Sequence, residues 1–229
     1  PQKRTRFILV GIQKQLASKK GVNAKSFFRF ISKNKKQFLE SRNLPQQPNL
    51  GSAISDLLRS NGTELTPDRG KKFKSGVYSV PKSKYQQYLR IGAQAPIPDS
   101  HSFANHKEHI EARFRYLIET SEGTKNISET IRKELGLSKH VIIPLSGSDK
   151  APTITTLPDD YIHYREARIL TVREYARIQS FPDWYEFKGK YTTGGQQRTQ
   201  EVPRYTQIGN AIPPLFSEQS GFILKQLIS

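Results

Sequence analysis

Three blocks of the sequence combine residue types that could act on a bound ligand: 2–6, 168–183 and 205–214. In the first block, Arg4 and Arg6 precede a short apolar run. A guanidinium is permanently charged, so it can stabilise developing negative charge without any tuning of its pKa. The third block contains a polar Gly-Asn-Ala turn before two prolines, and the backbone amides of such a turn can bind a small polar ligand.

The chain contains no cysteine. It therefore supplies no thiolate nucleophile, no disulfide and no thiolate metal ligand, a composition that is compatible with a reducing compartment. His106 and His109 are spaced about one helical turn apart. Because neither a cysteine nor a clear third ligand accompanies them, the sequence predicts exposed helix histidines and no metal site.

In their order and spacing, Gln2, Arg4 and Arg6, followed by the blocks 168–183 and 205–214, resemble the last three conserved motifs of the DNA cytosine-5 methyltransferase family. The long variable stretch between the first two blocks corresponds to the place where that family holds its target recognition domain. The family's Gly-rich S-adenosylmethionine loop, Pro-Cys nucleophile and Glu-Asn-Val motif are absent from the sequence. We therefore expect a carboxy-terminal fragment of such an enzyme or the second subunit of a split one.

The resemblance implies roles for the first and third blocks. Arg6, with Arg4 close by, would stabilise the negative charge that spreads onto a flipped cytosine. The alternative is that both arginines are solvated residues at a strand edge. Asn210 and Ala211 would contact S-adenosylmethionine, in a site that the amino-terminal part completes, and an ordinary cap between loop and helix is the alternative there.

For the second block, the resemblance implies a scaffold that holds the recognition domain against the catalytic body. Substitutions of its residues should therefore reduce the stability of the fold before they affect the chemical step. This motif comprises Arg168, Thr171, Arg173, Glu174 and Arg177. Phosphate binding by its arginines is the alternative interpretation.

The charge balance is strongly basic, because 37 Lys and Arg face 20 Asp and Glu and the formal net charge is +17. Such an excess predicts a polyanionic partner, with nucleic acid as the first candidate. The family resemblance implies that this partner is double-stranded DNA. The loop 69–76 is the preferred DNA contact, since its glycines permit close approach while Arg69, Lys71, Lys72 and Lys74 can neutralise phosphates. A solvated charged loop is the alternative.

No apolar run approaches the ~20 residues that span a bilayer, and no signal segment opens the sequence. We therefore expect no membrane contact and a cytoplasmic protein, associated with the nucleoid if its source is bacterial. RNA binding is the weaker alternative, because it rests on charge and tyrosine content alone.

The expected fold class is mixed α/β: part of an S-adenosylmethionine-dependent methyltransferase sheet with its closing carboxy-terminal helix, plus a small target recognition domain. A buried strand is predicted over 6–12. Helices are predicted over 52–58, around 110–118, over 127–135, over 171–180 behind a capping box of Thr171 and Glu174, and from 214 to the end.

These elements suggest four segments. Residues 1–20 hold a strand of the catalytic domain, 21–155 the target recognition domain, 156–204 its scaffold motif and hinge, and 205–229 the cofactor-side turn and the helix that returns to the catalytic domain. The stretch 191–195 lacks the Gly-Lys-Ser/Thr ending of a phosphate loop and is interpreted as a flexible loop near DNA.

On this resemblance we expect the DNA-recognition and carboxy-terminal part of a DNA cytosine-5 methyltransferase, which methylates C5 of a flipped cytosine in a specific duplex site, within a restriction-modification system. The enzyme needs an amino-terminal part or subunit that carries the catalytic cysteine, so the chain alone should be inactive. The alternative is a non-catalytic, sequence-specific DNA-binding or regulatory module.

Overall fold

The computed structural model describes residues 1–23, 25–192 and 201–229. Within the expected loop 191–195, positions 193–195 therefore lie outside the described residues. The helices are α1 (Lys14–Lys20), α2 (Ser26–Glu40), α3 (Leu50–Ile54), α4 (Lys84–Leu89), α5 (Glu108–Thr120), α6 (Glu129–Glu134), α7 (Val172–Ile178), α8 (Arg204–Asn210) and α9 (Pro214–Ile228), with short 3₁₀ helices η1 (Ser55–Leu57), η2 (Arg59–Asn61) and η3 (Pro158–Asp160).

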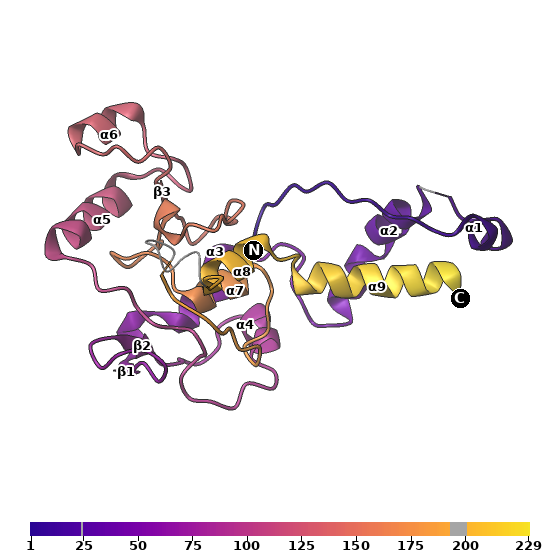
Figure 1. The fold of residues 1–229 in the computed structure, drawn as a ribbon, viewed down its shortest axis with the longest axis horizontal. Helices are drawn as coiled ribbons and strands as arrows, with labels where there is room; N and C mark the ends of the chain where they lie inside the picture. Colours follow the sequence, from indigo (N-terminus) through magenta and orange to yellow (C-terminus); the bar gives the residue numbers. More distant parts are fainter. Residues whose placement is uncertain (24, 193–200) are drawn as a thin grey trace.

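Two groups of helices lie towards opposite ends of the molecule's long axis (Figure 1). Helices α1, α2 and α9 lie at one end, with α9 reaching the carboxy terminus there, while α5 and α6 lie at the other end. Between them, α3, α7 and α8 form the centre of the fold.

Two small sheets occur in the described part of the chain. Strand β1 (Thr63–Leu65) pairs antiparallel with β2 (Lys74–Gly76), and β3 (Ile143–Pro144) pairs parallel with β4 (Tyr161–Ile162). The fold therefore mixes helices with short strands, as the sequence predicts. The larger methyltransferase sheet that we expected is not formed by the described residues alone.

The predicted buried strand over 6–12 is wrong for this chain. The segment has no strand pairing, and the side chains of Phe7 and Leu9 are 91% and 85% exposed. A strand needs neighbours that pair its backbone groups, and the described residues offer no such neighbour here, although Val10 packs against the cluster of Phe27, Ile223 and Leu227. Upstream, a single bridge joins Gln2 to Ala151.

Most of the predicted helices are confirmed. Helix α5 covers its predicted segment, and α6 lies within the predicted range 127–135 but begins later, behind the Ser128 cap. It ends before Gly136, which adopts the left-handed conformation expected at such a position. The helix predicted over 52–58 starts earlier, because the Asn49 side chain accepts a hydrogen bond from the Ser52 amide. It also ends earlier as an α-helix and continues as η1.

Helix α7 is the central element, and all of its residues are buried. The capping box is confirmed: the Thr171 hydroxyl accepts from the Glu174 amide, and the Glu174 carboxylate accepts from the Thr171 amide at 2.7 Å. The helix packs against α3 and α8. The core around it includes Leu50, Ile54, Tyr85, Leu89, Leu170, Val172, Tyr175, Ala176 and Ile208.

A buried guanidinium on α7 joins three segments of the chain. The Nε and Nη2 atoms of Arg177 donate to the Asp183 carboxylate at 3.0 and 2.6 Å, while Nη1 donates to Asp56 and, at 3.0 Å, to the Ala53 carbonyl. All three charged side chains are fully buried. A charge removed from water in this way requires such partners.

Two further ion pairs surround the start of α7. Arg168 donates to both oxygens of Glu174 at 2.8 and 2.7 Å, and Arg173 donates to the Asp99 carboxylate at 2.9 Å. Burial alone would raise the pKa of Glu174, but the charge and hydrogen bonds of Arg168 outweigh it and hold that pKa at about 2. The predicted motif is therefore an internal ionic network, and its arginines are not available to phosphates.

Helix α9 begins at Pro214, as the sequence predicts. Its apolar residues Ile223 and Leu227 pack against Phe27 of α2. The helix was expected to close a sheet, and in this structure it covers another helix instead. Phe222 and Ile228 remain 51% and 45% exposed on its outer face.

Replacing Arg177 with alanine should destabilise the fold by about 3–5 kcal/mol, because it removes the buried guanidinium that pairs with both Asp56 and Asp183. Urea unfolding followed by circular dichroism measures the change. Arg115→Ala, at an exposed position of α5, is the matched control and should change the free energy of unfolding little. Equal stability of the two variants would contradict the central role of this ionic network.

The stability of the fold should decrease as pH falls from about 6.5 towards 4. Burial lowers the pKa of His101 to about 4, whereas an unfolded histidine binds a proton near ~6.5. The unfolded chain therefore takes up this proton first, which costs about 2 kcal/mol of stability between pH 7 and pH 5. His101→Gln should make the pH dependence of the urea midpoint shallower, whereas exposed His140→Gln should leave its slope unchanged. A slope unaffected by His101→Gln would refute this source of pH sensitivity.

Candidate functional site

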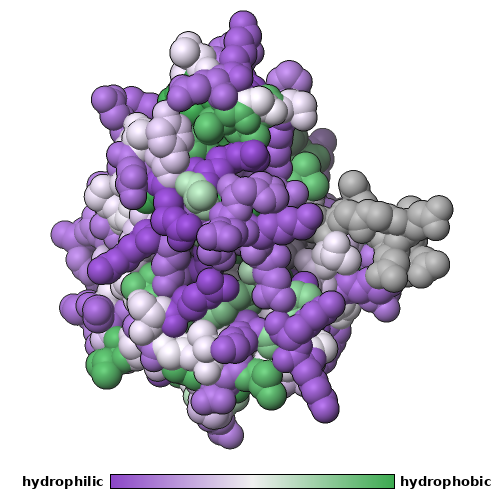
Figure 2. All heavy atoms as spheres, turned by 90° about the vertical axis from the view of Figure 1, so that its left-hand side faces the viewer, coloured by the Kyte–Doolittle hydropathy of each residue, from purple (hydrophilic) through white to green (hydrophobic). Residues whose placement is uncertain are grey.

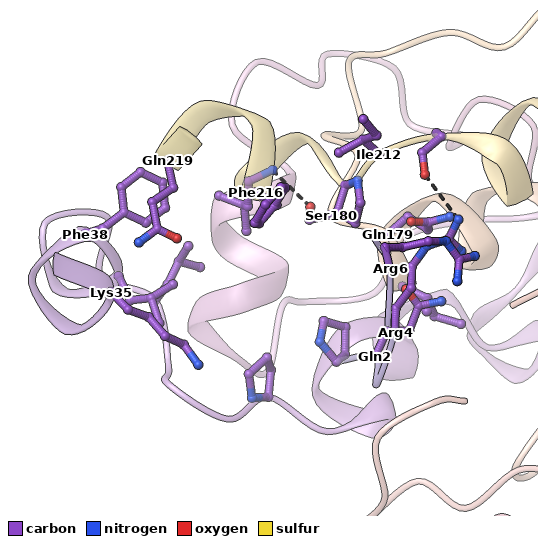
Figure 3. Close-up of a pocket in the computed structure, with 18 of the residues that line it drawn as sticks. Gln2, Arg4, Arg6, Lys35, Phe38, Gln179, Ser180, Ile212, Phe216 and Gln219 are labelled. Atoms are coloured by element: carbon purple, nitrogen blue, oxygen red, sulfur yellow. Dashed lines mark hydrogen bonds between the residues drawn. The ribbon is translucent and has the colours of Figure 1, made fainter. Parts of the chain in front are cut away.

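A pocket of about 690 Å³ brings the first and third sequence blocks together. Arg4, Arg6, Asn210 and Ala211 all line it. Figure 3 shows Arg4 and Arg6 on the amino-terminal segment, close to the residues that follow α7. Residues more than two hundred positions apart in the chain thus share one cavity.

Arg4 anchors the amino-terminal segment to the end of α8. Its Nη2 atom donates to the Gly209 carbonyl at 2.9 Å and to the Ala211 carbonyl at 3.4 Å. A cation at the carboxy-terminal end of a helix is favoured by the helix dipole and by the unpaired carbonyls there. Burial, and then the charge of Arg6, lower the pKa of Arg4, but a guanidinium remains charged. Arg4 is thus engaged with the protein itself.

Arg6 is differently placed. It is exposed, and its guanidinium makes one local hydrogen bond, to the Thr5 carbonyl at 2.8 Å. No ion pair of Arg6 occurs among residues 1–23, 25–192 and 201–229. The Arg6 guanidinium is permanently charged and lines the pocket, and its hydrogen bond to Thr5 is local. Such a group is suited to bind a ligand oxygen.

Two glutamines to which the sequence analysis assigned no role of their own, Gln2 and Gln179, line the pocket. The Gln179 side chain donates to the Ile208 carbonyl at 2.5 Å, while its buried Oε1 atom finds no hydrogen-bond partner among the described residues. Within the same described ranges, the buried Nε2 atom of Gln2 also lacks one. Unpaired buried polar atoms cost free energy unless a ligand or water satisfies them. Gln179 lies inside the second sequence block, but only its position after α7 turns it towards the pocket.

Asn210 and Ala211 do not form the separate polar turn that we expected. Asn210 is the exposed last residue of α8, and Ala211 follows as its cap. The preceding Gly209 lies against the backbone of the chain, because a Cβ atom there would approach the Thr155 carbonyl oxygen to 2.6 Å. This close approach seats the end of α8 beside the pocket.

The predicted DNA loop lies away from this pocket, on the β1–β2 hairpin. Lys71, Lys72 and Lys74 are exposed there. The Arg69 guanidinium is half-buried, 3.6 Å from the Phe73 ring centroid and 4.8 Å from that of Tyr191. Figure 2 looks onto the side of the molecule that carries the hairpin and α5, and hydrophilic side chains dominate that face.

The described residues contain no group of three His, Asp or Glu side chains that could hold a metal ion. The His106 ring instead packs edge-on against Phe114, with ring centroids 5.1 Å apart. Across the described ranges, no helix combines the length and apolar character needed to cross a membrane.

Comparison with known proteins gives a consistent result. The family model for C-5 cytosine-specific DNA methylases matches residues 1–226. The type II methyltransferase M1.HphI of Haemophilus parahaemolyticus is 31% identical over 184 residues, which are 75% of this chain and 42% of that protein. M.DdeI of Desulfomicrobium norvegicum is 31% identical over 149 residues, which are 61% of this chain and 35% of that protein.

A third relative is a short chain. The type II methyltransferase M.AquIB of Picosynechococcus is 36% identical over 100 residues, which are 43% of this chain and 64% of that protein. That relative is therefore shorter than the present chain. The chain spans less than two thirds of the length of each of these relatives.

Among solved structures, the fold is similar to that of a putative DNA modification methyltransferase encoded within an Escherichia coli prophage. The TM-score is 0.50 at 18% sequence identity, and the match covers 81% of this chain and 48% of the other. This likeness supports a methyltransferase-like fold.

Proposed function

Because the chain belongs to the C-5 cytosine-specific DNA methylase family, we propose that it is the DNA-recognition and carboxy-terminal part of a cytosine-5 methyltransferase. The assembled enzyme transfers a methyl group to C5 of a cytosine flipped out of a specific duplex site. The type II methyltransferase relatives favour a role in a restriction-modification system, with the cytoplasm as its place of action.

The single observation that carries this proposal is the shared pocket of Arg4, Arg6, Asn210 and Ala211. In it, Arg6 holds the extruded base and stabilises the negative charge that develops on its ring. Arg4 acts indirectly, because its hydrogen bonds to the end of α8 keep the segment with Arg6 beside Asn210. The unpaired Oε1 atom of Gln179 is an acceptor suited to an amino group of a ligand.

The pocket also fits one side of an S-adenosylmethionine site. Its wall combines apolar side chains such as Ile178, Ile212 and Leu215 with the exposed amide of Asn210, a mixture typical of small-molecule sites. Asn210 and Ala211 are the residues that would hold this cofactor, which supplies the methyl group. The remainder of its site belongs to the amino-terminal part.

An amino-terminal part is required by chemistry and supported by the exposed apolar surface. The family's reaction uses a cysteine thiolate, which this chain does not contain. The exposed Phe7 and Leu9, together with the apolar rim of the pocket, form a surface that such a part would cover.

Methyl transfer should require both parts. Labelled S-adenosylmethionine and mixed-sequence duplex DNA are incubated with this chain alone, and then with this chain plus the protein encoded immediately upstream. Methylation only in the mixture is the expected result, because the chain lacks the thiolate. Methylation by the chain alone would overturn the proposal. Inactivity of both samples with intact DNA binding would favour a non-catalytic DNA-binding module.

Arg6→Ala in the assembled enzyme should slow methyl transfer by roughly 10²–10³-fold, the usual cost of removing one group that stabilises transition-state charge. Duplex binding by the variant should change little, because Arg6 would contact the extruded base and not the backbone. Arg115→Ala, exposed on α5, is the control and should keep full activity. Parallel losses of binding and activity in Arg6→Ala would make Arg6 a phosphate contact instead.

A further inference from the structure

A second pocket, of about 340 Å³, lies directly beside the first one. Its polar lining consists of Ser32, Lys35, Lys36, Gln46, Gln47 and Lys150. Three ammonium groups and two side-chain amides thus surround one cavity, and none of its described lining residues carries a carboxylate. Lys35 and Gln46 belong to both pockets, and Figure 3 shows Lys35 on α2 among the residues of the first.

The three lysines are poorly neutralised by the protein. Lys36 has an exposed ion pair with Glu40 at 3.8 Å, which contributes little in water. The Lys150 ammonium donates to the neutral Gln47 amide oxygen at 3.3 Å. Within the described residues, neither Lys35 nor Lys150 forms an ion pair. Gathering like charges around one cavity is unfavourable unless an anion enters it.

The cations are held at a defined place relative to Arg6. Lys150 precedes Ala151, whose amide donates to the Pro1 carbonyl at 2.8 Å and whose carbonyl accepts from the Lys3 amide at 2.9 Å. These bonds join Lys150 to the segment that carries Arg6. On the other side, α2 is fixed because Leu39 packs against the central core.

We propose that Lys35, Lys36 and Lys150 bind a phosphodiester of the DNA backbone beside the pocket that receives the extruded base. This inference rests on the proposed function and assigns a contact outside the predicted loop 69–76. A phosphate held here fixes the position of the strand on the protein without reading its sequence. The neighbouring nucleotide is then directed into the pocket with Arg6, so the site anchors the backbone during extrusion.

The DNA backbone is a better occupant than a free anion. The pocket is formed by flexible lysine side chains and neutral amides, which suit a point contact to a phosphodiester within a long polyanion. The net charge of +17 draws such a polyanion to the whole molecule, and this pocket lies next to the proposed place of chemistry.

The double variant Lys35→Gln/Lys150→Gln tests the site through the salt dependence of binding to a mixed-sequence duplex. One lost phosphate contact should reduce the slope of log K against log salt by about 0.9 and weaken binding roughly tenfold near ~0.1 M salt. The control variant Lys125→Gln/Lys133→Gln removes the same charge at exposed positions that do not line the second pocket. It should leave the slope of log K against log salt unchanged. Lys35→Arg/Lys150→Arg should also keep it, since both charges remain.

The outcomes separate this site from the proposed function. If the unaltered chain fails to bind duplex DNA, the proposed function fails and the site with it. If the chain binds but both glutamine variants lose slope equally, only the site is refuted, since general positive charge explains the result. If inorganic phosphate at constant ionic strength displaces the duplex from the unaltered chain, the pocket prefers a free anion, and the assignment to the DNA backbone is overturned.

Discussion

The burial of the Arg177 guanidinium between Asp56 and Asp183 is the constraint on which the rest of the structure depends. Helix α7 has seven residues, and a helix of that length has little stability of its own. It is stable here because packing and ion pairs hold it from several directions. Once Arg177 is buried, the segments that carry Asp56 and Asp183 must come to it, since an unpaired buried charge is prohibitively costly.

The pocket follows from the same arrangement. Directly after α7, the Gln179 side chain binds the Ile208 carbonyl of α8, and the Ser180 hydroxyl accepts from the Leu215 amide at the start of α9. Arg4 then binds the carboxy-terminal end of α8 from the other side. The end of α7 thus positions Asn210 and Ala211 at the pocket, and Arg4 holds the segment with Arg6 beside them. The same hydrogen bonds therefore hold both helix α7 and the wall of the pocket in place.

Two surface regions beside the pocket differ in their chemistry. Around the pocket, Phe7 and Leu9 are exposed apolar side chains, which water does not favour and which a further protein part would cover. Beside it, Lys35 and Lys150 lack carboxylate partners among the described residues. An exposed apolar surface and a cationic pocket therefore adjoin the same cavity.

The sequence by itself determined the local features and the family. The Thr171–Glu174 capping box, the start of α9 at Pro214 and the helices α5 and α6 follow from interactions between residues a few positions apart, which spacing reveals. Only the tertiary structure decided that 6–12 has no strand partner and exposes Phe7 and Leu9, that α9 packs on α2, and that Gln179 and Lys150 line neighbouring pockets. Strand pairing, helix partners and cavity walls depend on residues distant in the chain, and no local pattern encodes which of them are present to meet.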